Sequence, residues 1–197
     1  MRSIFMDAYA INARLHMHTY GTTWRQIAAV SSKNHDHSTM NPLAQFQNAI
    51  SVEEILAARV ISWPLTLPMC SPISDGASAV VVCSGAALVR LSNARPVRVL
   101  ASVVRGGAKR ALEASDQAAV HLAARAAYER AGVGPQDISV AEVHDASAFA
   151  EIAHTEYLGL APFGEGGRVA ERRNHSRPKC RRSPKRLRPR ARSAWRA

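Results

Sequence analysis

The stretch that decides the fold is Ala141-Glu142-Val143-His144-Asp145-Ala146-Ser147-Ala148-Phe149-Ala150-Glu151. An apolar run, residues 138–143, predicts a β-strand, and a helix of small residues is expected to begin directly after it. His144 would then stand at the carboxyl end of a strand, where ligand sites of open α/β sheets form. His144 is therefore a candidate site residue. A histidine that only caps the helix or packs structurally would fit the same position.

Strands and helices alternate along the chain, which is typical of an α/β fold. The order strand 97–104, helix 116–131, strand 138–143 leaves a crossover long enough to join a parallel pair of strands. Ser51 and Glu54 have the spacing of a capping box. Residues 93–96 mark a domain boundary. Further helices are predicted at 7–18, 24–34, 51–59 and 85–91, and further strands at 60–61 and 77–83.

The formal charge of +11 lies in one segment of the 197-residue chain. Residues 172–197 contain ten arginines, two lysines and no acidic residue, whereas residues 1–171 carry 14 basic and 15 acidic side chains. The basic segment is rich in proline and poor in apolar residues, so it is predicted to be disordered. The remainder of the chain is electrostatically ordinary.

Composition points to a cytoplasmic protein without a membrane span. No run of eighteen apolar residues occurs, and Met1–Phe5 is not followed by the apolar region of a signal peptide. Three cysteines, Cys70, Cys83 and Cys180, suggest neither a disulfide framework nor a zinc site. Cys83 is expected in the core, and a nucleophilic role for Cys70 or Cys83 is disfavoured. His35 and His37 are interpreted as solvated loop histidines, so no metal site is predicted.

Several short motifs occur in a fixed order. They are Lys33-Asn34-His35 with His37-Ser38 and Asn41-Pro42, Ala44-Gln45-Phe46, Pro64-Leu65-Thr66-Leu67 with Cys70-Ser71-Pro72, Asp75-Gly76-Ala77, and His144-Asp145. With them the chain resembles the thiolase superfamily, and within it the sterol carrier protein x type, also called lipid-transfer protein thiolases. The resemblance runs from about residue 9 to residue 169.

The resemblance implies a thiolase-like layered α-β-α fold that is incomplete in this chain. Residues 1–93 would be the second half of the N-terminal thiolase domain with its loop region. Residues 94–171 would be a truncated C-terminal domain, followed by the disordered basic tail at 172–197. By resemblance we also expect coenzyme A or an acyl-CoA as substrate, no permanently bound cofactor, and a homodimer.

His144 and Ser71 are the site residues that the resemblance transfers. His144 stands where many thiolases have the asparagine of an Asn-Glu-Ala-Phe motif, which positions a water for an oxyanion hole. Ser71 matches a serine that contacts the pantetheine arm of coenzyme A, although its proline-flanked loop fits a structural role equally. Thiolases also use a nucleophilic cysteine, a Gly-His-Pro histidine and a Cys-x-Gly cysteine. No Gly-His-Pro occurs in this sequence, and Cys180 near the C-terminus is followed by Arg181-Arg182 rather than by a Cys-x-Gly pattern. The nucleophilic cysteine has no match either.

Two classes of function therefore stay open. The first is a thiolase-type acyltransferase whose polypeptide is inactive alone, because the covalent step needs the missing thiolate. The second is a non-catalytic binding or partner subunit whose basic tail binds nucleic acid or another polyanion. We favour a changed reading frame as the origin of the tail, since the family pattern runs into Gly164-Glu165-Gly166-Gly167 and then ends. Nucleic acid is accordingly not the expected partner.

Overall fold

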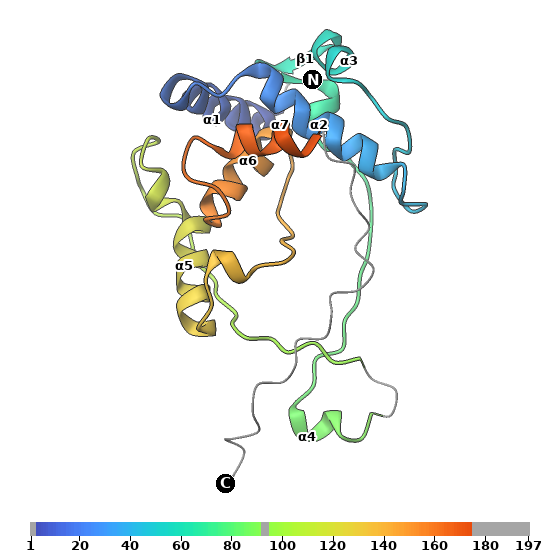
Figure 1. Ribbon diagram of the computed structural model, residues 1–197, viewed down its shortest axis with the longest axis vertical. Helices are drawn as coiled ribbons and strands as arrows, with labels where there is room; N and C mark the ends of the chain where they lie inside the picture. Colours follow the sequence, from blue (N-terminus) through green and yellow to red (C-terminus); the bar gives the residue numbers. More distant parts are fainter. Residues whose placement is uncertain (1–2, 92–94, 175–197) are drawn as a thin grey trace.

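The computed structural model describes residues 3–91 and 95–174, apart from the side chains of the last two. Its helices are α1 (Ile4–Tyr20), α2 (Trp24–Ser38), α3 (Val52–Ala57), α4 (Gly85–Leu88), α5 (Ala119–Ala131), α6 (Ala148–Tyr157) and α7 (Gly166–Asn174). The strands are β1 (Val60–Ser62) and β2 (Leu65–Thr66), which pair antiparallel. Short 3-10 turns occupy Leu67–Met69, Ser115–Gln117 and Pro135–Asp137. Figure 1 shows α1, α2, α3, α6 and α7 gathered in one body, with α4 on a long connection away from it.

Local signals determine where the N-terminal helices begin and end. Gly21, at φ 73°, ends α1 in the left-handed conformation that glycine adopts without steric cost. Thr23 begins α2 with a capping box to Gln26, and Ser51 begins α3 with one to Glu54. The predicted capping box at Ser51 is thereby confirmed. Each box satisfies backbone N–H groups that the first helical turn leaves without partners.

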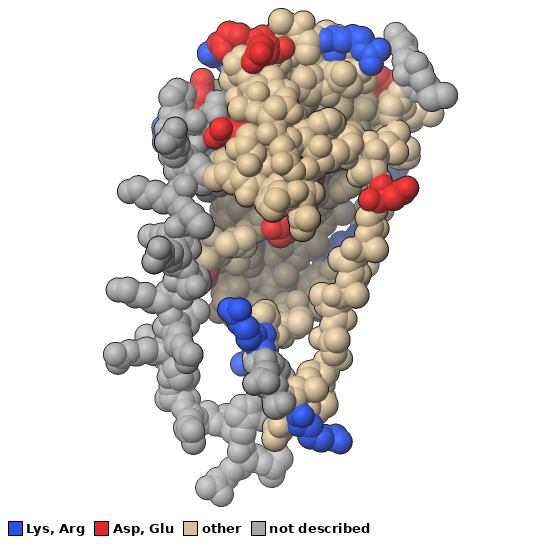
Figure 2. All heavy atoms as spheres, turned by 90° about the vertical axis from the view of Figure 1, so that its right-hand side faces the viewer, with Lys and Arg blue, Asp and Glu red and all other residues tan. Residues whose placement is uncertain are grey.

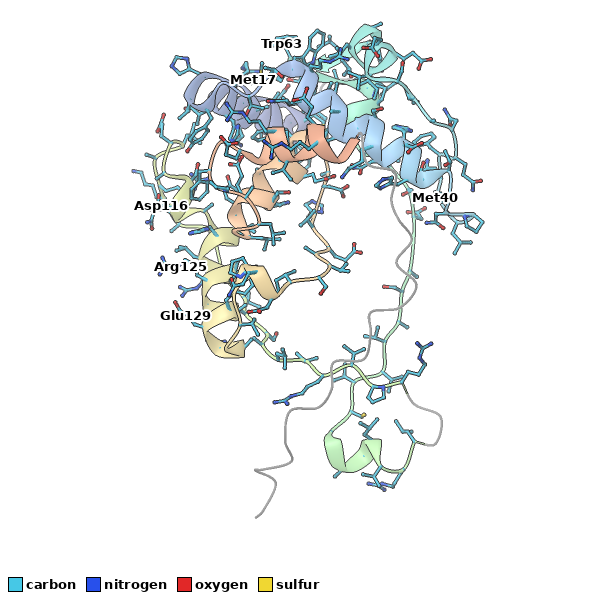
Figure 3. The ribbon with its side chains drawn as sticks, in the orientation of Figure 1. Met17, Met40, Trp63, Asp116, Arg125 and Glu129 are labelled. Carbon is cyan, nitrogen blue, oxygen red and sulfur yellow. The ribbon has the colours of Figure 1, made fainter. Side chains whose placement is uncertain are left out.

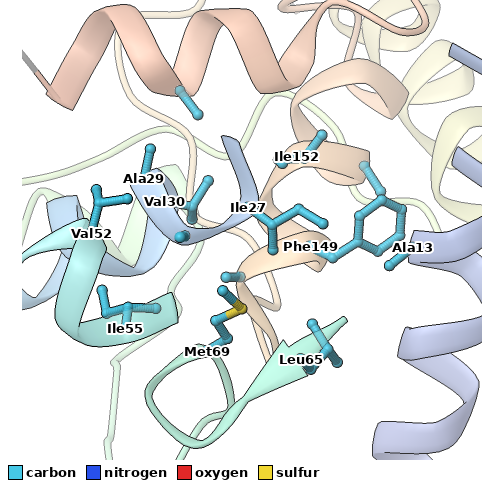
Figure 4. Packing of buried hydrophobic residues seen from close by; sticks show 14 of the residues in the cluster. Ala13, Ile27, Ala29, Val30, Val52, Ile55, Leu65, Met69, Phe149 and Ile152 are labelled. Carbon is cyan, nitrogen blue, oxygen red and sulfur yellow. The ribbon is translucent and has the colours of Figure 1, made fainter. Parts of the chain in front are cut away.

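Helix α2 lies at the centre of the hydrophobic core. Its residues Ile27 and Val30 are fully buried, and the helix packs against α3, α6 and α7. Figure 4 shows Ile27 between Phe149 of α6 and the side chains of Leu65 and Met69. The core therefore joins residues 24–38 to residues 148–157 across more than a hundred positions of sequence, which places the 144–147 turn beside α2.

Three predicted strands are not formed. Residues 77–83, 97–104 and 138–143 belong to no strand, and β1–β2 is the one sheet within the described residues. Val81 is 89% exposed and Val97 is 91% exposed. Cys83 is exposed as well, so its expected place in the core is also wrong. A strand that is apolar on both faces needs neighbouring strands and covering layers, and the described chain supplies neither to these segments.

Residues 73–91, which include α4, run away from the body (Figure 1). In the space-filling view of Figure 2 they descend from it as a narrow strip with few charged side chains. The predicted domain boundary at 93–96 falls partly on residues 92–94, which lie outside the described residues. The division into domains therefore stays a prediction.

Other boundaries differ from expectation by a few residues. Helix α2 continues to Ser38, so His35 and His37 are helical rather than part of a loop. Helix α5 begins at Ala119, because residues 115–117 form a separate 3-10 turn. Helix α7 continues to Asn174, three residues into the segment that was expected to be disordered. The remainder of that segment, 175–197, lies outside the described residues. None of the described helices has the length and apolar character needed to cross a bilayer.

Candidate functional site

A groove of about 760 Å³ lies between the C-terminal half of α2, the loop after it, the 67–72 segment and the start of α6. Its walls come from four of the five motif groups that carry the thiolase resemblance. They contribute Asn34, His35, Ser38, Ala44, Gln45, Phe46, Leu67, Cys70, Ser71, Pro72 and Asp145. Residues separated by more than a hundred positions thus meet in one concave surface, which is the usual form of a small-molecule site.

Helix α2 supplies a polar wall of the groove. Ser31, Asn34, His35 and Ser38 have the helical spacing that puts side chains on one face. Apolar lining comes from Phe46, Ile50, Leu67 and Met69. In Figure 3 the labelled Met40 lies just after the C-terminal end of this helix. The combination suits a ligand that is largely apolar and carries a few polar groups.

The two predicted site segments are joined by backbone pairing. The N–H of Ser71 donates to the carbonyl of Ala146 at 3.1 Å, and Cys70 forms an antiparallel bridge with Ser147. The Ser147 hydroxyl, fully buried, accepts from the N–H of Ala150 at 3.3 Å and caps α6. This pairing brings Ser71 and Asp145 into the same groove.

His144 is exposed and precedes the turn that contributes Asp145. It follows an irregular segment rather than the expected strand, so its predicted place at a strand end is wrong. Its imidazole is not among the lining residues of the groove. The structure thus brings Ser71 to the groove and leaves His144 next to it, one residue away from Asp145.

A second histidine, His154 on α6, lies within electrostatic range of His144 and Asp145. Burial lowers its pKa, the nearby His144 lowers it further, and Asp145 acts in the opposite direction. Its Nδ1 is buried and has no hydrogen-bond partner among the described residues. His154 was not predicted from the sequence, because ten positions separate it from His144 and only the fold shows that the two interact.

Glu151 is another residue that the sequence analysis missed. Its carboxylate accepts hydrogen bonds from Lys33 and, at 2.9 Å, from Asn34 Nδ2. The side chains of Lys33 and Glu151 are 11% and 20% exposed. The Lys-Asn pair was quoted as part of a motif, but its partner 117 positions away gives no local signal.

Cys70 and His35 also line the groove. Burial raises the pKa of the Cys70 thiol, and its Sγ donates to the carbonyl of Thr66 at 3.4 Å. Both effects favour the protonated thiol over a nucleophilic thiolate. The rings of His35 and Phe46 lie 6.0 Å apart. Within residues 3–91 and 95–174 no three metal-ligating side chains come together.

Comparison with known proteins defines the class. A family model described as thiolase C-terminal domain-like matches residues 106–180, and the relatives below match most of the chain. The chain belongs to the thiolase superfamily, as its motifs indicated.

Three relatives show how far the similarity extends. The benzoylsuccinyl-CoA thiolase subunit BbsB of Thauera aromatica is 40% identical over 166 residues, covering 83% of this chain and 43% of the relative. An acetyl-CoA acetyltransferase of Methanothermobacter thermautotrophicus is 41% identical over 170 residues, covering 85% and 44%. Sterol carrier protein 2 of Bos taurus is 38% identical, covering 80% and 30%. The chain therefore spans less than half the length of these relatives.

A solved structure confirms the thiolase-like fold. The Ltp2-ChsH2(DUF35) aldolase is 26% identical, with a TM-score of 0.71 over 82% of this chain and 44% of that one. More than half of that chain has no counterpart here. This agrees with an incomplete thiolase fold, in which apolar strand sequences such as 77–83 are without sheet neighbours.

Proposed function

We propose that this chain binds coenzyme A or an acyl-CoA thioester through the pantetheine chain, in the groove between α2 and the 144–147 turn, and that it does not transfer acyl groups alone. The observation that carries the proposal is the convergence of Ser71 and Asp145 on one groove. Its volume falls within the range of about 300–1,000 Å³ that small-molecule sites occupy. A pantetheine chain, with methylene groups and two amides, matches a groove of mixed apolar and polar lining.

His144 is proposed to serve the oxyanion side of the site. An imidazole N–H, or a water that it holds, can donate a hydrogen bond to an oxygen that becomes negative during reaction at a thioester. The exposed position of His144 beside Asp145 leaves its ring accessible to such a ligand. Ser71 is proposed to contact the pantetheine arm.

Inactivity of the polypeptide alone is proposed on chemical grounds. Covalent acyl transfer needs a thiolate, and the pKa of the groove thiol, Cys70, is raised by burial. The sequence contains no Gly-His-Pro motif that would supply the partner histidine. Binding and chemistry would then be separable in this chain.

Calorimetric titration of the full chain with coenzyme A and acetyl-CoA tests the binding. Ser71→Ala should weaken binding by about fivefold if the hydroxyl donates one hydrogen bond, whereas Ser84→Ala, at the exposed start of α4, should leave it unchanged. Absence of binding would overturn the proposal. A thiolysis assay tests the inactivity, and turnover above background would overturn that part.

The aldolase named above favours a second candidate, an aldol-type cleavage of a carbon–carbon bond. In the acyl-CoA groove proposed here its substrate would be a β-hydroxyacyl-CoA. Such cleavage needs a general base and a stabilised enolate rather than a covalent cysteine. Incubation of the chain with a β-hydroxyacyl-CoA would release a carbonyl compound and a shorter thioester. No release at high protein concentration would dismiss this candidate.

Assembly and location complete the proposal. We propose a cytoplasmic homodimer, by resemblance, and no native nucleic-acid function for the basic segment. Sedimentation equilibrium tests the dimer. DNA affinity across a salt series, with and without residues 172–197, tests the segment, since phosphate contacts give steep salt dependence. Tight, sequence-selective binding would support the polyanion-binding alternative instead.

A further inference from the structure

A partly buried cluster of three residues joins α2 to α6 beside the groove. Lys33 and Asn34 are consecutive on α2, and both donate to the Glu151 carboxylate, Lys33 to Oε1 and Asn34 to Oε2. All three side chains are at least partly buried. Glu151 lies one helical turn after Ala148 on α6, and both Ala148 and the preceding Asp145 line the groove.

Asn34 is where this cluster meets the groove, because it both binds Glu151 and lines the cavity. A carboxylate only accepts hydrogen bonds, so it holds the NH₂ end of the Asn34 carboxamide and excludes the flipped arrangement. The carboxamide oxygen is then turned away from Glu151. Among the hydrogen bonds of the described residues, none goes to Asn34 Oδ1, which leaves this acceptor open to a ligand.

We propose that Glu151 is a positioning residue that orients Asn34, so that Asn34 Oδ1 accepts a hydrogen bond from an amide N–H of the bound ligand. The inference rests on the proposed function, since pantetheine contains two secondary amides. It assigns to Asn34 a specificity for amide N–H groups that an apolar wall would not provide. Such a site rejects an analogue without the donor, because the protein acceptor is then left unpaired.

A purely structural role is the competing explanation. The Lys33–Glu151 ion pair could simply hold α2 against α6, and its loss would then weaken all ligands equally. Discrimination between two ligands separates the explanations. The test compares pantetheine with its ester analogues. In each analogue the N–H of one amide is replaced by oxygen.

The decisive variant is Lys33→Met/Glu151→Gln, which removes both charges together and leaves no unpaired buried cation. Glutamine can present either its oxygen or its nitrogen, so the Asn34 carboxamide is free to flip. Wild type should bind pantetheine about fivefold more tightly than one of the ester analogues, the value of one neutral hydrogen bond. In the double variant this ratio should fall to about one.

Two further variants complete the design. Asn34→Ala keeps the ion pair and should also reduce the ratio to about one, which covers the case in which the double variant does not fold. Arg25→Met/Glu53→Gln makes nearly the same pair of changes in an exposed ion pair of 2.8 Å between α2 and α3, and should leave the ratio unchanged. A ratio in the double variant equal to that of wild type would overturn the inference.

Failure of the proposed function gives a different result. If wild type binds neither ligand, the ligand assignments of both proposals are overturned. The orientation of Asn34 is still tested by the NMR signals of its side-chain NH₂ group, whose exchange with solvent should be slower in wild type than in the Lys33→Met/Glu151→Gln variant. Identical exchange rates would overturn the positioning role itself.

Discussion

The backbone N–H of Ser71 donates a hydrogen bond to the carbonyl oxygen of Ala146 at a distance of 3.1 Å. This bond, with the bridge between Cys70 and Ser147, holds the loop that carries one predicted site residue against the turn that carries the other. The groove depends on this contact, because its walls on this side have no regular sheet to support them. Changes at the turn should therefore affect both stability and binding.

Ser147→Ala should lower the free energy of unfolding by about 1 kcal/mol, the usual cost of an N-cap hydroxyl. Ser147 is fully buried and its Oγ accepts from the N–H of Ala150 at the start of α6. Ser84→Ala is the matched control, because Ser84 makes the same kind of cap on the short, exposed helix α4. Urea unfolding measures both changes. If both substitutions lowered the free energy of unfolding by the same amount, the turn before α6 would be no more important for stability than the start of α4.

Ile27→Ala should lower the free energy of unfolding by about 2–5 kcal/mol, the range for truncating a fully buried aliphatic side chain. Ile27 is 0% exposed at the centre of the contact between α2 and α6. Ile73→Ala makes the same change at a side chain with no burial and should be neutral within about 0.5 kcal/mol. Thermal unfolding monitored by circular dichroism compares them. A neutral Ile27→Ala would mean that this core does not hold the fold together.

The sequence predicted those features that depend on near neighbours along the chain. The capping box from Ser51 to Glu54 and the end of the predicted helix 116–131 at Ala131 depend on only a few consecutive residues, and both are found in the structure. Strand 77–83 failed for the opposite reason. Its valines favour a strand, but sheet formation depends on distant partners that no local pattern specifies.

Residues of the candidate site differ in the same way, because some have a local sequence signal and others act only through distant contacts. Ser71 was found by its motif, whereas Glu151 and His154 act through contacts with residues far away in sequence. For His35, the polar composition after it suggested a loop, although the helix continued to Ser38 and turned this residue toward the groove. Motif recognition identified the segments of the site, and the fold identified which side chains cooperate.

His154 should make the protein less stable in mild acid. Burial and the nearby His144 lower its pKa in the folded protein. Below about pH 6.5 the unfolded chain therefore binds more protons at this imidazole than the folded chain does. The contribution of His154 to the free energy of unfolding should therefore be greatest above that pH. It should decrease as the pH falls toward the lowered pKa of the folded protein. His154→Gln should remove this part of the pH dependence.

Urea unfolding of wild type and His154→Gln at about pH 7.5 and about pH 5.5, on either side of the ordinary histidine pKa, measures the effect. His18→Gln serves as the control, because His18 is exposed near the end of α1 and should leave the wild-type pH dependence in place. A pH dependence that is the same in all three proteins would contradict the assignment to His154.

Replacement of Val80, Val81 and Val82 by threonine should reduce self-association of the chain. These side chains are 82–89% exposed in an extended segment without strand partners, and unpaired apolar strands pair readily with other chains. Threonine keeps the shape and β-propensity of valine while making the surface polar. Val89→Thr, at an equally exposed valine beside α4, is the control and should change little. Light scattering over a concentration series should show association in wild type that is weaker in the triple variant. A wild type that stays monomeric at all concentrations would show that these valines do not mediate contacts between chains.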